Sequence, residues 1–371
     1  MIVGVTGGNG FLGWHLRVRL LAAGIQSMTA TRETFASEVA LDEFVSESEV
    51  LVHVAGVNRA SSDDEITSGN ISLAESLVAA ARRTSSDAPI LYTSSTQIDR
   101  DNAYGRAKAK AGEVLQSWCA ESGTAFANVV LPHLFGEFGR ENYNSAVTTF
   151  AFCLATGEQP SINRDGALEL LHAQDVSQWV VEWLQSPTSI NHRMAGRTIS
   201  VGEVWDLLQA QHERYSTDLT VPAFENTFEL QVFNTLRSQL YRAGHYPIPI
   251  TLHGDERGAF AELCRSDGTG QTSVSTSFPG VQRGDHFHFD KIERFVVVAG
   301  QAEIKVRRLL TDELQTFTVS GSDPVAIDMP PLCTHNIRNT GDDIMTTIFW
   351  AGDHFDPANP DTFVEPVKTA L

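Results

Sequence analysis

A glycine-rich turn, TGGNGFLG at residues 6–13, limits this chain to a few folds, because it directly follows the apolar run Ile2–Thr6 and opens a helical pattern. Glycines spaced three residues apart permit a tight turn, a close backbone approach to a pyrophosphate and close packing of the helix on the strand. The first N–H groups of such a helix bind phosphate. The motif therefore predicts a dinucleotide site, with cofactor contacts from Gly7, Gly10, Phe11, Leu12 and Gly13.

Apolar runs alternate with longer helical patterns through the first half of the chain. Strands are expected at Val50–Val54, Ile90–Thr93 and Ala127–Leu131, and a helix at about 11–23. Strands that alternate with helices usually pair in parallel. This half therefore predicts an α/β, Rossmann-like, doubly wound parallel sheet with helices on both faces.

After about residue 251 the pattern changes to short alternating strands separated by turn residues, which predicts an all-β sandwich or barrel. Helices are expected at about 204–215 and 226–242, and Gly244–Ile250, with its two prolines, is the expected linker. We therefore predict an NAD(P)-binding domain at 1–245 and an all-β domain at 246–371. The strands expected in the second domain are Thr272–Phe278, Phe295–Val298, Ala302–Arg307, Gln315–Val319, Val325–Met329 and Met345–Trp350.

Composition excludes several functions. The chain has 371 residues, with 46 Asp plus Glu against 27 Lys plus Arg and a net charge of −19. A nucleic-acid surface needs clustered Lys and Arg, so no nucleic-acid partner is expected. No run approaches the roughly 18 apolar residues of a membrane span, and no basic region precedes Ile2, so we expect neither a span nor a signal peptide, and a cytoplasmic protein. The four widely separated cysteines are typical of reduced thiols.

The type of dinucleotide depends on a side chain about twenty residues after the glycines, where the sequence reads Thr31-Arg32-Glu33. An arginine there binds a ribose 2′-phosphate, and an acidic residue binds a free 2′-hydroxyl. Arg32 therefore favours NADPH as the cofactor, whereas Glu33 leaves NAD as the alternative.

Tyr104 and Lys108 enter a helical pattern at about 106–118, and residues four apart share one helix face. The Lys108 ammonium can then lower the pKa of the Tyr104 phenol, which donates a proton to an alkoxide forming from a carbonyl. The hydroxyls of residues 94–96 follow the strand Ile90–Thr93, at the carboxyl end where ligands bind in parallel sheets. One of them is expected to hydrogen-bond the substrate carbonyl.

These motifs, in this order, resemble the extended short-chain dehydrogenase/reductase family. The likeness extends to the strand end VHVAG at 52–56, to Asn70 and to LPHLFG at 131–136. It implies a Rossmann-like domain that transfers a hydride between a nicotinamide cofactor and a carbonyl substrate.

The resemblance also implies residue roles. Ser95, Tyr104 and Lys108 match the catalytic residues of the family, with Ser94 and Thr96 as near alternatives to Ser95. Only eight residues separate Ser95 from Tyr104, a shorter loop than the family usually has. The cofactor contacts implied at these and nearby positions are Ala55, Tyr104 and Lys108.

A histidine-rich segment, HFHFDKIE at residues 286–293, lies in the predicted all-β domain. His286 and His288 alternate, so both point to one face of a strand, and Glu293 and His335 can converge on them from neighbouring strands. Three imidazoles and a carboxylate suit a divalent metal, zinc first, with iron, manganese or nickel as alternatives. The set therefore predicts a metal site at His286, His288, Glu293 and His335.

This spacing, with Gly300 and Asn339 further on, resembles the two motifs of the cupin family, a double-sheet jelly roll. Leu332 stands where the second motif usually has a glycine. The resemblance implies a cupin fold for the second domain, with the four predicted ligands inside it.

Two segments, 254–260 and 283–286, resemble nucleotide-sugar 3,5-epimerases. In those metal-free enzymes the matching histidine removes a proton beside a keto group, but their partner lysine is absent here. His286 is therefore interpreted as a base or a metal ligand. Should the domain epimerise with metal bound, Lys291 or Lys305 is the expected base.

The fusion of a short-chain reductase to a cupin resembles the bifunctional capsular-polysaccharide enzymes that make UDP-N-acetyl-L-fucosamine precursors. In that family the cupin epimerises C3 of a UDP-2-acetamido-2,6-dideoxy-4-hexulose, the reductase then reduces the C4 ketone with NADPH, and known members are dimers. The resemblance implies a UDP-linked 4-keto-6-deoxy amino sugar as substrate and a homodimer. Residues expected to line the sugar pocket are Asn142, Tyr143 and Asn144.

Two alternatives stay open. One is an NAD-dependent sugar-nucleotide epimerase or dehydratase that retains its cofactor, with a structural or metal-binding cupin; Glu33 on the ribose favours it. The other is a non-enzymatic NADP-sensing scaffold, which has no need for the tuned phenol of Tyr104.

Overall fold

The computed structural model describes residues 1–217, 220–256, 258–354 and 356–367. The chain forms two compact units. The first comprises Met1–Phe135 and Ala167–Ile199, and the second comprises Gly136–Gly166 and the chain from Ser200 onward.

The first unit is built on a six-stranded, wholly parallel sheet with strand order β2-β1-β3-β4-β5-β8. This confirms the predicted doubly wound, Rossmann-like parallel sheet. The strands are β1 (Ile2–Thr6), β2 (Gln26–Ala30), β3 (Val50–His53), β4 (Ile90–Ser95), β5 (Phe126–Leu131) and β8 (Ile190–Arg193). A smaller sheet joins β6 (His133–Phe135), β7 (Ala167–His172) and β9 (Arg197–Ser200).

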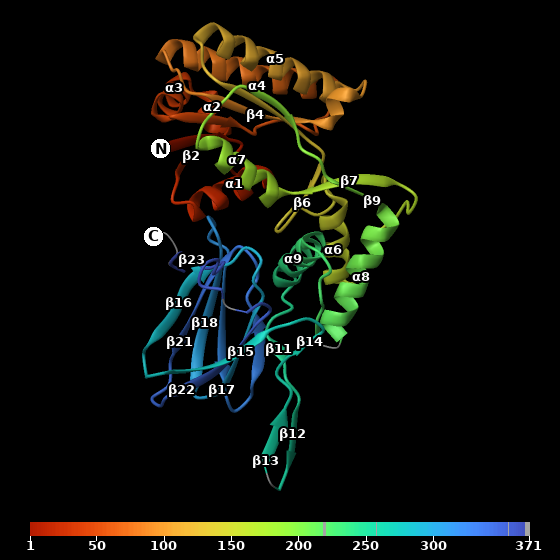
Figure 1. Cartoon of the computed structure of the whole chain (residues 1–371), viewed down its shortest axis with the longest axis vertical. Coiled ribbons are helices and arrows are strands. Elements are labelled where there is room, and N and C mark those ends of the chain that lie inside the picture. The colour runs from red at the N-terminus through yellow and green to blue at the C-terminus, as the bar shows by residue number, and fades with distance from the viewer. Residues whose placement is uncertain (218–219, 257, 355, 368–371) are drawn as a thin grey trace. The chain divides into compact units, whose positions relative to one another are not determined.

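Helices cover both faces of the six-stranded sheet (Figure 1). They are α1 (Phe11–Ala22), α2 (Arg32–Ala36), α3 (Glu38–Glu47), α4 (Asp63–Thr84), α5 (Ala103–Ser122) and α7 (Ala173–Leu184). Val50 and Val52 of β3 pack with α1 and α7, whereas Leu51 packs with α3, α4 and α5. Successive side chains of one strand thus enter opposite cores, as expected for a strand buried on both faces.

The second unit contains two five-stranded sheets, β11-β20-β17-β22-β15 and β19-β18-β21-β16-β23, with antiparallel neighbours. This confirms the predicted all-β architecture after the parallel sheet. The strands are β11 (Ile248–Pro249), β15 (Gln271–Ser277), β16 (Gln282–Phe287), β17 (Glu293–Ala299), β18 (Gln301–Arg308), β19 (Leu314–Ser320), β20 (Val325–Asp328), β21 (Cys333–Asn339), β22 (Met345–Ala351) and β23 (Phe363–Val364). A hairpin of β12 (Leu252–Asp255) and β13 (Gly258–Ala261) and a short pair of β10 (Thr220–Val221) and β14 (Arg265–Ser266) accompany them.

Among the residues that the structure describes, the helices of this second unit are α6 (Ala146–Thr156), α8 (Val201–Thr217) and α9 (Thr227–Arg242). Every residue of α9 from Gln231 to Tyr241 is buried, and the Tyr241 hydroxyl donates to the carbonyl oxygen of Val306 in β18 at 3.0 Å. None of the described helices is both long enough and apolar enough to cross a membrane.

The segment expected to be a linker, Gly244–Ile250, is instead packed into the second unit. Tyr246 is buried and its hydroxyl lies 2.7 Å from that of Tyr215, while β11 pairs with β20. The segment therefore packs against the all-β part. The prolines in the sequence indicate a break in secondary structure, but they do not indicate this packing. The domain boundary at residues 245 and 246 stays a prediction.

Candidate active site and metal centre

The glycine-rich turn packs so closely that a side chain would not fit at two of its positions. Gly7 has φ of +68°, and a Cβ there would lie 2.8 Å from the Cα of Ala55 at the end of β3. A Cβ on Gly13 would lie 2.2 Å from the carbonyl oxygen of Gly7. The two glycines therefore allow β1, the first turn of α1 and Ala55 to meet, as the motif predicts.

The N-terminus of α1 differs from those of α4 and α5. Ser62 and Asn102 cap α4 and α5 with side-chain oxygens, whereas Gly10 caps α1 and has no side chain to accept a hydrogen bond. The first N–H groups of α1, on Phe11 and Leu12, are thus not met by a capping side chain. This arrangement fits a pyrophosphate at the helix N-terminus.

The predicted ribose contacts lie at the start of α2. Arg32 is exposed, and the Thr31 hydroxyl donates to the Glu33 carboxylate at 2.6 Å, which lowers the pKa of Glu33. Thr31 also caps α2. The Glu33 carboxylate therefore already accepts a hydrogen bond within its own turn.

Sequence reasoning missed Arg17, one helical turn after Gly13 on α1. Its guanidinium folds back onto the glycine-rich turn and donates to Gly8 O at 3.4 Å and to Asn9 Oδ1 at 3.0 Å. Burial lowers its pKa, its Nε has no hydrogen-bond partner, and no carboxylate among the described residues pairs with it. A half-buried guanidinium without a counter-ion fits an anionic ligand beside this turn. The i,i+4 spacing from Gly13 is the signal that points to it.

The start of α5 is positioned by two neighbours of Tyr104. Asn102 caps the helix by accepting from the N–H of Gly105 at 2.7 Å. A Cβ on Gly105 would lie 2.0 Å from the carbonyl oxygen of Gln97, in the 3-10 turn η1 (Thr96–Asp99). Glycine therefore lets α5 pack directly against the turn that follows Ser95.

Lys108 is buried, with 3% of its surface exposed, and its Nζ lies 4.3 Å from the centre of the Tyr92 ring. The Tyr92 hydroxyl donates to the carbonyl oxygen of Lys108 at 3.0 Å. Burial lowers the pKa of Lys108 to about 7, and burial followed by the charge of Tyr104 raises the pKa of Tyr92. Tyr104 and Lys108 are therefore brought together around Tyr92, which the sequence reading did not identify.

Ser95 ends β4 and is half-buried, whereas Ser94 is buried. The Ser95 Oγ accepts a hydrogen bond from the N–H of Gln97 at 3.2 Å. Its hydroxyl hydrogen is then left to donate to another acceptor, such as a carbonyl oxygen. This geometry suits the role predicted for Ser95.

Two buried polar residues, His53 at the end of β3 and Asn70 on α4, lie near Lys108. Asn70 accepts from the N–H of Val57 at 3.1 Å and donates to the carbonyl oxygens of Val57 and Ile66, each at 2.7 Å. His53 Nδ1 lies 2.8 Å from the hydroxyl of Thr6. Burial, with a smaller effect of the Lys108 charge, lowers the pKa of His53 to about 3. A buried neutral histidine and a fully bonded asparagine thus fix the backbone next to the lysine.

The buried His53 predicts a pH-dependent stability. Its folded-state pKa of about 3 is below the unfolded value of 6.5, so the unfolded state binds more protons between those values and stability falls as pH drops through that window. The free energy of unfolding is expected to fall by about 2 to 3 kcal/mol between pH 7 and pH 4.5 from this residue alone. Urea unfolding of wild type and His53→Asn at both pH values checks this; an equal fall in both proteins contradicts it.

The residues predicted to line the sugar pocket, Asn142, Tyr143 and Asn144, belong to the second unit and precede α6. Asn142 and Asn144 are exposed, and the Arg140 guanidinium lies 5.2 Å over the Tyr143 ring. Their role stays a prediction.

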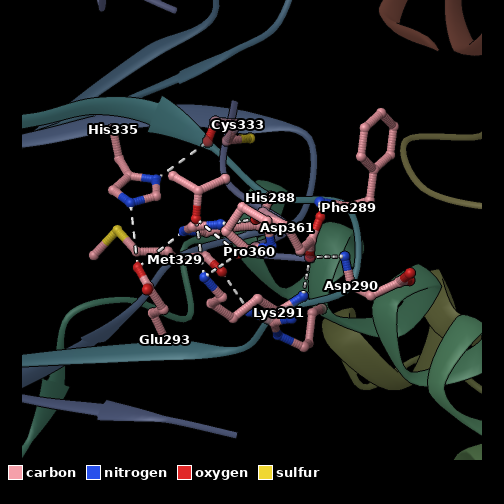
Figure 2. A network of polar contacts seen from close by, with 12 residues as sticks. His288, Phe289, Asp290, Lys291, Glu293, Met329, Cys333, His335, Pro360 and Asp361 are labelled. Carbon is pink, nitrogen blue, oxygen red and sulfur yellow. Dashed lines mark hydrogen bonds and ion pairs between the residues drawn. The ribbon is translucent and has the colours of Figure 1, made fainter. Parts of the chain in front are cut away.

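The four predicted metal ligands do converge. His286 and His288 come from β16 and the turn after it, Glu293 begins β17, and His335 lies on β21, paired with His286. One potential ligand atom from each residue lies within 4.8 Å of all the others. Glu293 Oε2 is 3.0 Å from His288 Nε2 and 3.6 Å from His335 Nε2 (Figure 2).

The ring nitrogens of these histidines fit a cation in the cluster. His288 Nδ1 lies 2.5 Å from the carbonyl oxygen of Asp361, and His335 Nδ1 lies 3.3 Å from that of Cys333. A neutral imidazole carries one N–H, so a ring that donates through Nδ1 presents a bare Nε2 toward the Glu293 carboxylate. Two acceptors facing each other in a buried site call for a metal ion or a proton between them.

The charges in this cluster are strongly perturbed. Burial opposes ionisation of Glu293, but its contacts with the His288 and His335 rings outweigh burial and hold the Glu293 pKa far below its usual value. Burial, with the charges of His335 and His288, lowers the pKa of His286 to about 4. An ionised Glu293 beside an uncharged His286 is the protonation state that metal ligation requires.

The two lysines considered as bases lie differently. Lys305 is wrong as a base beside this cluster: its neighbour Val306 pairs with His335, so alternation places Lys305 on the opposite face of β18, where it pairs with Glu303 at 2.8 Å. Lys291 donates to the carbonyl oxygen of Pro360 at 2.7 Å.

Leu332 takes the left-handed conformation that the usual glycine would adopt. Its φ is +56°, it is fully buried, and its N–H donates to the carbonyl oxygen of His288 at 3.0 Å. The departure from the cupin motif therefore keeps the backbone shape, with a strain of about 1–2 kcal/mol.

Comparisons with known proteins agree with this geometry. Residues 3–202 match the NAD dependent epimerase/dehydratase family, and residues 253–363 match the polysaccharide biosynthesis C-terminal domain. The chain is similar to UDP-2-acetamido-2,6-beta-L-arabino-hexul-4-ose reductase of Pseudomonas aeruginosa, at 34% identity over 98% of both chains. Capsular polysaccharide assembling protein CapF from Staphylococcus aureus is 30% identical, with a TM-score of 0.62, over 99% of this chain and 100% of that one.

A third relative covers less of the chain. Spore coat polysaccharide biosynthesis protein SpsL of Bacillus subtilis is 29% identical over 119 residues, which is 29% of this chain and 79% of that protein.

The parallel sheet with its glycine-rich turn and buried lysine therefore defines a nucleotide-binding enzyme domain joined to an all-β domain of polysaccharide biosynthesis. The chain belongs to the NAD dependent epimerase/dehydratase family and, within it, to the capsular-polysaccharide enzymes that its sequence resembles.

Proposed function

We propose that this chain is a bifunctional nucleotide-sugar enzyme. Its all-β domain, a cupin, epimerises C3 of a UDP-2-acetamido-2,6-dideoxy-4-hexulose, and its Rossmann-like domain then reduces the C4 ketone with NADPH. The observation that carries the proposal is the buried Lys108 against Tyr92, one helical turn after Tyr104 on α5, on a chain that matches a hexulose reductase along its whole length. A dinucleotide-binding scaffold has no need for a buried lysine at this place.

In the reduction, each residue has one task. Ser95 donates its hydroxyl hydrogen to the C4 oxygen and Tyr104 gives that oxygen a proton as it becomes an alcohol. Lys108, whose pKa of about 7 rises when an anion binds nearby, supplies positive charge beside the phenol. NADPH, when bound, supplies the hydride.

Arg17 supports NADPH over NAD. The 2′-phosphate is the one dianionic group that distinguishes the two cofactors, and Arg17 is a guanidinium without a counter-ion at the glycine-rich turn. Replacing it with methionine is expected to weaken NADPH binding about tenfold to a hundredfold, because a hydrogen bond to a charged group contributes roughly 1.5–3 kcal/mol. Binding of NADH should change little.

Titration calorimetry with both cofactors measures this. Arg19→Met is the matched control. It removes an arginine from the same helix, but this arginine donates instead to the side chain of Gln174. Arg32→Met shows which arginine dominates. Equal losses for NADPH and NADH in Arg17→Met contradict a 2′-phosphate contact.

His286, His288, Glu293 and His335 would hold a divalent metal, zinc first. When bound, it stabilises the negative charge that forms on the sugar oxygens as C3 is deprotonated. Two of these ligands are oriented by hydrogen bonds from their Nδ1 atoms to backbone carbonyl oxygens, His288 to Asp361 and His335 to Cys333.

The central experiment mixes the enzyme with NADPH and a UDP-4-keto-6-deoxy-HexNAc substrate in deuterated water. The proposal predicts deuterium at C3 by NMR together with loss of NADPH absorbance, and loss of the exchange after chelation of the metal. Absence of both reactions overturns the substrate class, and a tightly bound NAD in the purified protein would then favour the epimerase or dehydratase alternative.

The homodimer and the cytoplasmic location remain part of this proposal. In the described part of the chain, β15 is an edge strand that exposes Val274 at 67% and is followed by Phe278 at 70%. An edge strand with exposed apolar side chains suits pairing with a second copy. Light scattering should find a dimer for wild type and a monomer for Val274→Lys. If both proteins are dimers, the interface lies elsewhere.

A further inference from the structure

A segment far along the chain holds the turn that carries the metal ligands. The Asp361 carboxylate accepts hydrogen bonds from three consecutive N–H groups, those of Phe289 at 3.0 Å, Asp290 at 2.9 Å and Lys291 at 2.7 Å (Figure 2). These three residues lie between His288 and Glu293. One carboxylate therefore fixes most of the backbone that connects these two ligands.

The same residue also contacts a ligand directly. The carbonyl oxygen of Asp361 lies 2.5 Å from His288 Nδ1. A histidine that donates through Nδ1 is held in one tautomer and one ring orientation, with Nε2 directed at the Glu293 carboxylate. Asp361 adopts φ of +41°, a left-handed conformation that aspartate tolerates better than most residues.

The segment around Asp361 has its own anchors on the barrel. Lys291 donates to Pro360 O at 2.7 Å and to Thr362 Oγ1 at 2.9 Å. The next residue, Phe363, pairs with Phe287 of β16 and stacks on its ring, with centroids 5.3 Å apart. Asp361 is thus fixed from both sides, so it can hold the ligand turn.

We propose that Asp361 is a positioning residue that sets the metal affinity of the cluster, by orienting His288 and by fixing the turn to Glu293. The inference rests on the proposed metal site. Residues that hydrogen-bond a ligand histidine commonly change metal affinity tenfold to a hundredfold when they are replaced. A tail segment, rather than the ligand strands alone, therefore completes the metal centre.

The test uses the full chain, stripped of metal and titrated with Co²⁺ and Zn²⁺. Asp361→Ala removes the carboxylate that holds residues 289–291 but keeps the carbonyl oxygen beside His288 Nδ1. It is expected to bind both metals about tenfold more weakly and to change the visible absorption bands of bound Co²⁺, which report ligand geometry. Asp361→Asn keeps the side-chain volume and one acceptor oxygen, so a smaller loss is expected. Asp356→Ala, which removes a carboxylate that bonds the N–H of Ala358 in the same segment, is the matched control with wild-type affinity.

The unfolding midpoint of each metal-free variant separates positioning from general destabilisation. Weaker metal binding and altered Co²⁺ bands at an unchanged midpoint support the proposal. Wild-type affinity and bands in both Asp361 variants overturn it and leave the metal site intact. Absence of metal binding by wild type overturns the metal site itself, and the role of Asp361 with it.

Discussion

A Tyr104→Phe variant is expected to reduce the 4-keto sugar at least a hundredfold more slowly than wild type, while it exchanges the C3 hydrogen with solvent at the wild-type rate. Phenylalanine keeps the ring and the helix but lacks the proton that the C4 oxygen must receive, and loss of a general acid lowers rates by about 10²–10⁴. In the proposed function, exchange at C3 depends on the histidine cluster of the other unit, whose residues the substitution does not change.

NADPH absorbance and NMR in deuterated water measure the two reactions in one tube. Tyr241→Phe is the matched control, because it removes a tyrosine hydroxyl from α9 in the second unit, where that hydroxyl bonds the carbonyl oxygen of Val306. Both reactions should survive in it. A Tyr104→Phe variant that keeps a tenth of its reductase rate would contradict the role of the phenol, and one that also loses exchange would contradict the division between domains.

The features predicted correctly from sequence are those encoded within one element. The glycine-rich turn before α1, the helix that carries Tyr104 and Lys108, and the strand that carries His286 each follow from the pattern of a single segment. The two kinds of sheet could also be predicted. Strands that alternate with helices indicate a parallel sheet, and short strands separated by turns indicate an antiparallel one.

The missed features depend on which elements meet. In the sequence, Tyr92 and His53 are simply members of apolar runs that are predicted as strands. Only the packing of α5 against the sheet makes them neighbours of Lys108. Asp361 is separated by about seventy residues from the turn that it holds. Periodicity shows which face of an element is buried, but it does not show against what.

The contacts of α8 and α9 show the same limit. Their helical pattern resembles that of the preceding helices, yet their side chains contact the all-β part. Tyr215 of α8 donates to Asp328 of β20 at 2.5 Å, and Arg237 of α9 donates to the carbonyl oxygen of Met329. Buried polar partners 113 and 92 residues away in sequence leave no local signal.

Asp328→Asn is expected to destabilise the protein by about 3–5 kcal/mol, because it leaves a buried arginine without its counter-ion. Arg294 forms two hydrogen bonds to Asp328, at 2.6 and 2.9 Å, and the two residues are 2% and 0% exposed. Burial opposes ionisation of Asp328, but Arg294 outweighs it and keeps the Asp328 pKa below its usual value. Asparagine removes the charge while it retains the shape.

Urea unfolding followed by circular dichroism measures the loss, and two further variants interpret it. Asp206→Asn breaks an ion pair with Arg164 whose side chains are 57% and 54% exposed, and should cost less than about 1 kcal/mol. Adding Arg294→Met to Asp328→Asn also removes the buried guanidinium that has lost this carboxylate, so the double variant should be more stable than the single one. A single variant no less stable than Asp206→Asn would contradict the buried pair.

The position of this ion pair adds a second readout. Asp328 also accepts from Tyr215 of α8, whose hydroxyl contacts Tyr246 of the segment before β11, so one carboxylate joins a helix, that segment and two strands. When the carboxylate is replaced, amide hydrogen exchange should accelerate in α8 as well as in β17 and β20, because they open as one unit. Exchange that accelerates in the strands alone would mean that α8 is held by its other contacts, and that the all-β domain unfolds independently of the helices before it.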